Sequence, residues 1–318
     1  MKKLRITLIF LVVLLLPILA ACSLRDTPME NISYEEPTTQ WPWGDEVPLM
    51  WRATSPAGQT MYLFGSIHVG YDSIYPLPDF IMDAFHRSDY LAVEFDLTAI
   101  HPIETTAIMG ELLTYADGRT AVDDMGEELH QRASSFMAEH RMTPPHNFKP
   151  IIWYVLITNI FVDLAGLSGD YGLDMFFLLE AAQRDMGILE VESARLQFEM
   201  FAGFSMPLQL SLLEASLANV EGSVEGMKEL FDLWGRGDAQ AIEALFQRGS
   251  YIERDELTEE YLDALLTQRD IDMTAMARSY MTDGKNVFFV VGLGHLLGEG
   301  SVVDLLQRYG YDVVIVRY

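Results

Sequence analysis

The chain has 318 residues, half of them hydrophobic, and carries 47 Asp and Glu against 21 Lys and Arg, which gives a net charge of −26. An acidic surface of this kind repels nucleic-acid phosphates, and the basic residues are scattered singly, so nucleic acid is excluded as a partner. The single cysteine, Cys22, excludes an intramolecular disulfide, and an exported domain must then be stabilised by its core alone.

The first 21 residues have the pattern of an export signal. Basic residues at the start are followed by an apolar run over 6–19, and the small residues Ala20 and Ala21 precede Cys22. This pattern resembles a bacterial lipobox, in which Cys22 becomes the lipid-bearing first residue after cleavage. The alternative is an ordinary signal peptide with an incidental cysteine. We expect an exported protein anchored through Cys22 to the outer face of the cell membrane, or a periplasmic or outer-membrane lipoprotein in a host with two membranes.

Residues 22–45 are polar and proline-bearing with little periodicity, which is typical of a flexible tether. The remaining domain, 46–318, is long for one domain but within the range of an α/β fold. It opens with apolar segments at 47–52 and 61–64, separated by a Ser-Pro-Ala-Gly turn, and this pattern predicts a β-hairpin.

The second strand of that hairpin begins the first of two similar units. Residues 60–68 read as a buried strand ending in Gly65-x-x-His68, and residues 286–295 read as another ending in Gly292-x-x-His295. A short Gly/Pro-containing loop, an amphipathic stretch and a further apolar strand follow each motif; the stretches are 80–87 and 302–309, and the strands 90–95 and 311–316.

Between the two units, over about residues 100–283, the apolar period becomes helical. Helices are predicted over 105–113, 126–141, 150–166, 173–185, 192–203, 206–219, 224–236, 238–247 and 257–282, with a short strand at 186–192. The run 151–162 is strongly apolar but shorter than the roughly 18 residues of a membrane span, so it is predicted to be a buried core helix. The expected fold is therefore α/β (α+β), with a central sheet from both units and a large helical insertion.

A histidine at the carboxyl end of a buried strand points into the crevice where open α/β sheets bind ligands. His68, His295 and Glu94, which lies in the run 91–95, could together hold Mn, Fe, Co or Zn, or act without metal as a general base and an orienting acid. Gly65 and Gly292 fit a close backbone approach there. No Walker loop, GxGxxG, HExxH or GxSxG motif is present, which excludes a nucleotide cofactor and leaves a serine-hydrolase interpretation without support.

Eight segments, in the same order as in the family, closely resemble the TraB/PrgY/GumN family. They are 62–70, 75–78, 91–96, Gly172-Leu-Asp174, Val191-Glu-Ser193, Gln197, Arg269-Asp270 and 290–297. The family includes the animal Tiki proteins, which look like metal-dependent peptidases built on two GxxH motifs. The resemblance implies a central site of His68, Glu94 and His295, with Glu192 and Arg269 as further candidates.

Two positions depart from the family pattern. Asp270 stands where many relatives have Asn, which adds a negative charge near a possible substrate clamp at Arg269, and Ser66 replaces a usual Thr. Each of three candidates could instead have a purely structural role. Glu94 could be a strand residue paired to an arginine, Glu192 an acid at a helix start, and Arg269 a solvated helix charge.

We therefore expect a metal-dependent hydrolase of peptide or amide bonds, with the metal held by His68, His295 and Glu94. Glu192 would act as the base, and Arg269 would orient a substrate carboxylate through its fork. Two alternatives remain open: a non-catalytic protein that binds or sequesters a pheromone-like peptide, and a metal-free esterase-like hydrolase. The ligand is in each case a peptide or small molecule, and the oligomeric state is left open.

Overall fold

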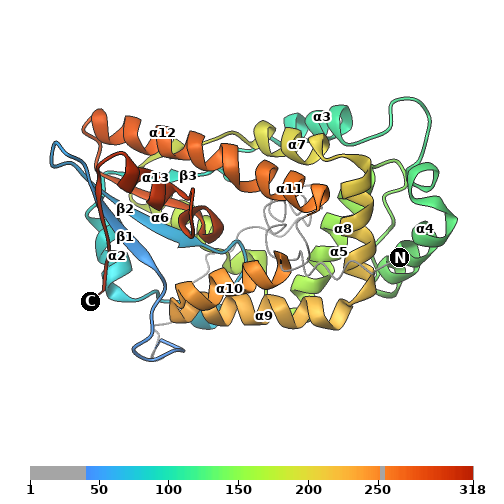
Figure 1. Ribbon diagram of the computed structural model, residues 1–318, viewed down its shortest axis with the longest axis horizontal. Coiled ribbons are helices and arrows are strands. Elements are labelled where there is room, and N and C mark those ends of the chain that lie inside the picture. Colours follow the sequence, from blue (N-terminus) through green and yellow to red (C-terminus); the bar gives the residue numbers. More distant parts are fainter. Residues whose placement is uncertain (1–40, 251–254, 318) are drawn as a thin grey trace.

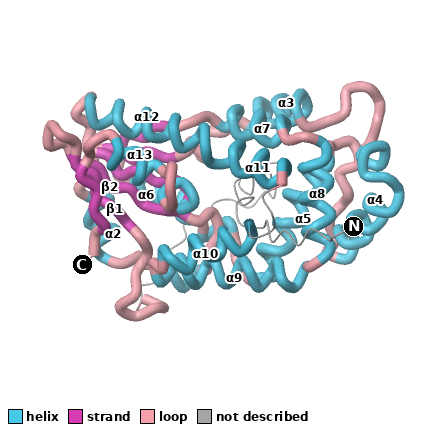
Figure 2. The backbone as a smooth tube through the Cα atoms, viewed as in Figure 1, coloured by secondary structure: helices cyan, strands magenta, loops and turns pink. Residues whose placement is uncertain are grey.

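The computed structural model describes residues 41–250 and 255–317. The predicted signal peptide, Cys22 and most of the predicted tether lie outside these residues. The strands gather at one end of the elongated molecule and the helices fill the rest (Figures 1 and 2).

A six-stranded mixed sheet forms the strand-rich end, in the order β4-β3-β5-β2-β1-β6. Its strands are β1 (Met50–Thr54), β2 (Thr60–Ser66), β3 (Tyr90–Val93), β4 (Gly187–Glu190), β5 (Val287–Gly292) and β6 (Asp312–Ile315). The predicted hairpin is confirmed, because β1 pairs antiparallel with β2. β5 lies between β2 and β3, parallel to both, and Val287 to Val291 are fully buried, as expected for a strand covered on both faces.

The two sequence units interleave in this sheet. The first consists of β2, α2 (Asp79–His86) and β3, and the second of β5, a short 3₁₀ turn (Leu293–Leu296), α13 (Val302–Arg308) and β6. β2 and β5 are parallel neighbours, with Ser66 opposite Gly292. Because parallel strands end at the same edge of a sheet, both GxxH motifs leave the sheet side by side. This arrangement confirms the expected fold class.

The middle of the chain is helical, as predicted. Its helices are α3 (Pro102–Leu112), α4 (Ala121–Glu139), α5 (Pro150–Ala165), α6 (Leu173–Gln183), α7 (Ala194–Gly203), α8 (Met206–Ala218), α9 (Val220–Arg236), α10 (Ala239–Ser250), α11 (Glu256–Leu262) and α12 (Gln268–Thr282). α5 is the predicted core helix, with 12 of its 16 residues buried. Within 41–250 and 255–317, no helix is long and apolar enough to cross a membrane.

Two helices differ from their predicted extent for identifiable backbone reasons. α4 begins at Ala121 rather than 126, and Gly126 adopts φ 70° inside it, a conformation that glycine accepts without steric cost. The helix predicted over 257–282 is interrupted by a π-helical turn, Asp263–Thr267. Single π turns inside helices frequently occur at functional sites, and this one ends two residues before Arg269.

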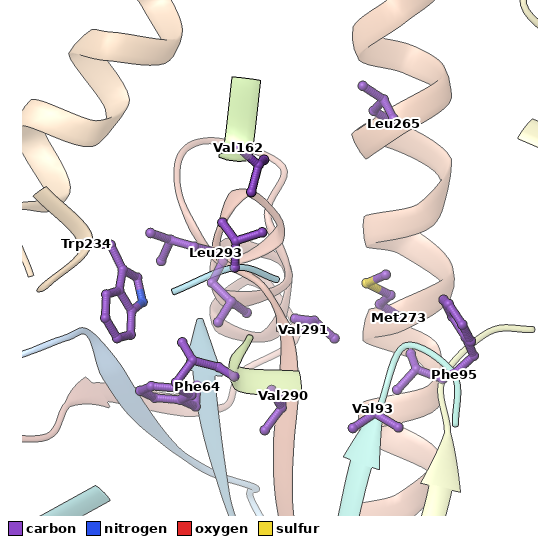
Figure 3. Close-up of a cluster of buried hydrophobic side chains, with 14 of the residues drawn as sticks. Phe64, Val93, Phe95, Val162, Trp234, Leu265, Met273, Val290, Val291 and Leu293 are labelled. Carbon is purple, nitrogen blue, oxygen red and sulfur yellow. The ribbon is translucent and has the colours of Figure 1, made fainter. Parts of the chain in front are cut away.

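Residues before the predicted domain boundary at 46 also pack against the helices. Trp41 and Trp43 contact Trp234 of α9 edge-on, and Trp43 donates a hydrogen bond to Asp232 (2.7 Å). Trp234 in turn donates to the carbonyl of Gly65 (2.9 Å) and belongs, with Phe64, to the core beside the sheet edge (Figure 3). The end of the predicted tether is therefore fixed to the helix that supports the first GxxH motif.

Candidate functional site

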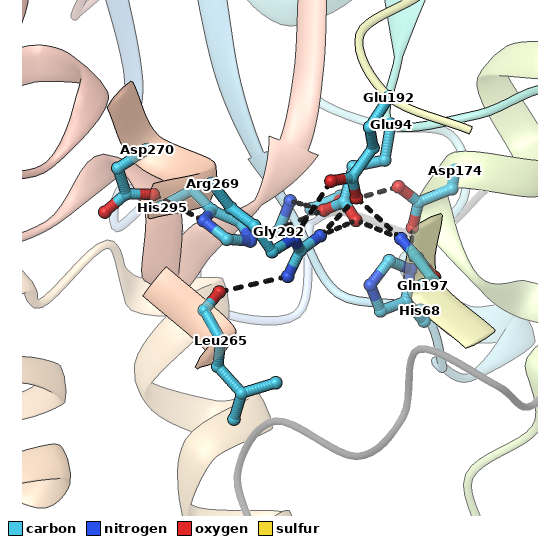
Figure 4. Close-up of polar contacts among 11 residues, drawn as sticks. His68, Glu94, Asp174, Glu192, Gln197, Leu265, Arg269, Asp270, Gly292 and His295 are labelled. Carbon is cyan, nitrogen blue, oxygen red and sulfur yellow. Dashed lines mark hydrogen bonds and ion pairs between the residues drawn. The ribbon is translucent and has the colours of Figure 1, made fainter. Parts of the chain in front are cut away.

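The candidate site lies at the carboxyl ends of β2, β3 and β5. His68 follows β2 by two residues, Glu94 directly follows β3, and His295 lies in the 3₁₀ turn after β5. The parallel arrangement of these strands brings together three side chains that are far apart in the sequence (Figure 4). The helices α6, α7 and α12 supply the groups that surround them.

His68 is held by a carboxylate on its Nδ1 side. Its Nδ1 lies 2.6 Å from Asp174 Oδ2, and Ser66 donates a hydrogen bond to the other oxygen of Asp174 (2.8 Å). Burial by itself lowers the pKa of His68. The charge and hydrogen bond of Asp174, together with the charge of Glu94, outweigh the effect of burial, so the pKa of His68 lies above its ordinary value. The same ion pair lowers the pKa of Asp174 despite its burial.

His295 has a similar partner but a different electrostatic balance. Its Nδ1 lies 2.5 Å from Asp270 Oδ1, and its side chain is only 1% exposed. Burial and the charge of Arg269 lower the pKa of His295, and Asp270 only partly offsets them. Its Nε2 lies 3.9 Å from Glu94 Oε1 and has no hydrogen-bond partner among residues 41–250 and 255–317. A buried imidazole nitrogen without a partner is costly, and it marks where a ligand would bind.

Arg269 joins the carboxylates of Glu94 and Glu192 in a buried network. It donates to Glu192 through Nε (2.9 Å) and Nη2, to Glu94 Oε2 through Nη2 (2.8 Å), and to the Leu265 carbonyl of the π-helical turn through Nη1 (3.0 Å). Gln197 donates to both glutamates, at 2.9 Å and 2.8 Å. The two carboxylates raise the pKa of Arg269 even though burial opposes this shift. The guanidinium fork therefore faces protein carboxylates.

Gly292 marks the space shared by the three central side chains. Its N–H donates to Glu94 Oε1 (2.8 Å). A Cβ at this position would lie 3.3 Å from Glu94 Oε1, 3.6 Å from His295 Cδ2 and 3.9 Å from His68 Nε2. Gly65 permits a second close approach, because a Cβ there would lie 3.2 Å from the Cα of Leu293. The glycines of the two motifs thus lie where the motifs meet.

The cluster has an excess of negative charge. Four buried carboxylates, those of Glu94, Asp174, Glu192 and Asp270, share the cluster with the permanent positive charge of Arg269 and with His68, which balances Asp174 when protonated. A buried charge excess is costly unless a cation or proton compensates it. Within the described part of the chain, Gln197 Oε1 and His295 Nε2 have no hydrogen-bond partner, which adds to this demand for a cation or hydrogen-bond donor.

The donor set fits a divalent cation, although a complete ligand cage is not assembled. Among residues 41–250 and 255–317, no three His, Cys, Asp or Glu side chains are arranged to hold a metal ion. Two imidazoles and a carboxylate oxygen are nevertheless the ligand types that Mn, Fe, Co and Zn accept. A carboxylate on the Nδ1 side of each histidine is also the usual support for a metal-binding imidazole.

All five candidate side chains predicted from the sequence lie in this cluster: His68, Glu94, Glu192, Arg269 and His295. Asp174, named only through the family resemblance, and Asp270, expected as a charge near the substrate clamp, contact the two histidines. Gln197 was recognised only through the family resemblance. A short polar residue at the start of a helix gives no indication that it faces a strand end elsewhere in the chain.

Gly172 positions the backbone of His68, and its replacement gives a testable result. A Cβ on Gly172 would lie 2.3 Å from the His68 carbonyl oxygen, although φ −68° and ψ 140° suit any residue. Gly172→Ala is expected to destabilise the fold by about 1–3 kcal/mol through this clash, measured by urea unfolding. The control is Gly203→Ala in α7, whose Cβ would meet nothing within 4 Å. Equal stability of the two variants would contradict this close approach of Gly172 to His68.

The fold and the cluster define a mixed α/β protein with a buried site of two histidines and several carboxylates at one sheet edge. The TraB/PrgY/gumN family model matches residues 49–315, and the chain belongs to this family.

Several curated proteins are similar over most of the chain. Metalloprotease TIKI1 of Xenopus tropicalis is 24% identical over 303 residues, which cover 80% of this chain and 59% of that protein. The human TIKI1 metalloprotease is 22% identical, covering 79% of this chain and 59% of its own length. The uncharacterized protein YbaP of Escherichia coli is 24% identical, over 80% of this chain and 90% of its own length. The chain thus spans about three fifths of the length of these Tiki relatives. No solved structure is significantly similar to it.

Proposed function

We propose that the protein is an extracytoplasmic, lipid-anchored hydrolase that cleaves peptide or amide bonds with the help of a divalent metal ion. The observation that carries this proposal is the pair of GxxH histidines, each with Nδ1 on a carboxylate and with Glu94 beside them. The metalloprotease names of the Tiki relatives support the reaction type. The lipobox pattern at Cys22 supports the anchor and the location.

The residues that would hold the ion are His68 and His295, with Glu94. A divalent ion in such a site supplies a Lewis acid that polarises a carbonyl and lowers the pKa of water. Arg269 holds Glu94 and Glu192 in place, and the buried charge excess favours a cation over an anionic ligand. For Glu192 to act as a general base, or for Arg269 to orient a substrate carboxylate, their ion pair must first open.

The proposal is tested with the purified full-length chain in detergent. The chain, either loaded with Mn²⁺, Co²⁺ or Zn²⁺ or exhaustively chelated, is incubated with a mixed peptide library, and the products are identified by mass spectrometry. We expect new cleavage products with the loaded protein, and none after chelation or with His68→Ala. Peptides retained by the protein but recovered whole would favour the binding alternative. Cleavage unaffected by chelation would favour the metal-free hydrolase.

Gly292→Ala tests the shared space without removing any polar group. The backbone angles of Gly292, φ −50° and ψ 136°, suit alanine, so the fold should be retained. The added methyl group would fill the space between Glu94, His295 and His68, and we expect Co²⁺ affinity to fall about 10-fold or more. The measurement is a Co²⁺ titration followed by absorption.

The matched control for this substitution is Gly110→Ala in α3, where an added Cβ meets nothing within 4 Å. Its Co²⁺ affinity should equal that of the wild type. A Gly292→Ala variant with unchanged affinity would place the ion elsewhere.

A further inference from the structure

Each GxxH histidine takes its Nδ1 partner from the helical insertion rather than from its own strand unit. Asp174 is the second residue of α6, and Asp270 is the third residue of α12. Both carboxylates are buried, with 5% and 4% of the residue exposed. Two helices far apart in the sequence thus place the same chemical group on the same ring atom of two histidines (Figure 4).

The chemistry of these contacts determines which nitrogen carries the proton. An ionised carboxylate only accepts hydrogen bonds, so each Nδ1 must donate, and the neutral ring then has its lone pair on Nε2. The Ser66 hydroxyl occupies the second oxygen of Asp174 and so prevents that carboxylate from rotating. Asp270 makes its contact from a rigid helix, where Thr274 also bonds to its backbone carbonyl (2.6 Å).

The Nε2 atoms are left for other partners. His68 Nε2 would lie 3.9 Å from a Cβ on Gly292, and His295 Nε2 lies 3.9 Å from Glu94 Oε1, with no hydrogen-bond partner in the part of the chain that the structure describes. Each carboxylate therefore orients its ring from the Nδ1 side. In this orientation the Nε2 lone pairs of both histidines face the space beside Gly292. Two structural ion pairs placed at random would have no reason to share this geometry.

We propose that Asp174 and Asp270 are a matched pair of positioning residues that hold His68 and His295 in the Nδ1–H tautomer, with both Nε2 lone pairs directed at one ligand position. What occupies that position rests on the proposed function. The tautomers and ring orientations are properties of the metal-free chain.

The test is ¹⁵N NMR of the imidazoles in the metal-free full-length chain, at a pH where both rings are neutral. Both histidines should show the Nδ1–H tautomer in the wild type. They should also show it in Asp174→Asn and Asp270→Asn, because the side-chain oxygen of asparagine also accepts a hydrogen bond from Nδ1–H. In Asp174→Leu and Asp270→Leu, the ring facing the substitution should move toward the Nε2–H tautomer. Asp272→Asn, on an exposed part of α12, should change neither ring.

A Co²⁺ titration is the second measurement. Removing a carboxylate partner of a metal-binding histidine typically weakens binding 10- to 100-fold, so each Leu variant should lose about that factor and each Asn variant less. If a Leu variant fails to fold, the Asn variants still test the proposal, because loss of the charged acceptor should shift the Nδ1–H proton upfield.

The outcomes separate this proposal from the proposed function. A wild-type Nε2–H tautomer, or Leu variants with unchanged tautomers and affinity, would overturn the positioning role while leaving a metal-dependent activity possible. If the tautomers are as expected but the chain binds no Co²⁺, the positioning role would be supported and the proposed metal site would be overturned.

Discussion

Replacing either His68 or His295 by alanine is expected to abolish stoichiometric metal binding. The wild-type chain should bind about one divalent ion, and each variant should lose more than the roughly 100-fold that the loss of a supporting residue costs, because a ligand itself is removed. The measurements are metal content by mass spectrometry and a Co²⁺ titration. Loss in both variants would establish that one ion requires both motifs.

The controls for this prediction separate binding from folding. His101→Ala removes an exposed histidine at the start of α3 and should leave metal content unchanged. His295→Ala also leaves Asp270 without its hydrogen-bond partner, so a loss of about 1–3 kcal/mol of stability is expected and is measured by urea unfolding of the same variant. Full metal binding by both alanine variants would eliminate the proposed site.

Replacing Arg269 by methionine is expected to lower the free energy of unfolding by about 3–5 kcal/mol, more than the loss of either histidine. Methionine fills a similar volume, but it leaves Glu94 and Glu192 buried together without a cation. The like charges then repel each other in a region of low dielectric. Urea unfolding, followed by circular dichroism, measures the change.

Two further variants test the cause. Arg87→Ala removes an ion pair with Asp83 whose side chains are 71% and 63% exposed, and the stability should change by less than about 1 kcal/mol. Adding Glu192→Gln to Arg269→Met removes one of the two buried carboxylate charges that lack a cation. This double variant should regain part of the lost free energy of unfolding. If the double variant were no more stable than Arg269→Met, charge burial would not be the cause.

The predicted fold agrees with the structure where the apolar pattern is strong. The continuous apolar run at β5 predicted a buried strand, and the run in α5 was too short for a membrane span and was predicted to be a core helix. Patterns of this kind reflect how much of an element is buried, which depends mainly on local sequence. The kink at Gly126 and the π-helical turn at 263–267 were missed, because a helical period in the sequence does not show where the backbone departs from α-helical geometry.

The site was predicted less completely. The matched Gly-x-x-His patterns indicated His68 and His295 as candidates, and a carboxylate in an apolar run indicated Glu94, and the structure places the three side chains together. The supporting residues were harder to identify, because Asp174 has the ordinary sequence context of a helix start and Asp270 lies in a polar stretch. Their importance depends on which atoms they contact, and a helical period says nothing about that.

The sequence alone indicates the acidic composition, the two strand–GxxH units, the helical insertion and the histidines and carboxylates that are candidates for binding a cation. These features follow from composition, local periodicity and side-chain chemistry, which act over a few residues. Only the folded chain shows that β2 and β5 are parallel neighbours, that the fork of Arg269 faces Glu94 and Glu192, and that Asp174 and Asp270 contact the two histidines. Such contacts join residues that are roughly 25 to 225 positions apart, and only the packing of the whole chain brings them together.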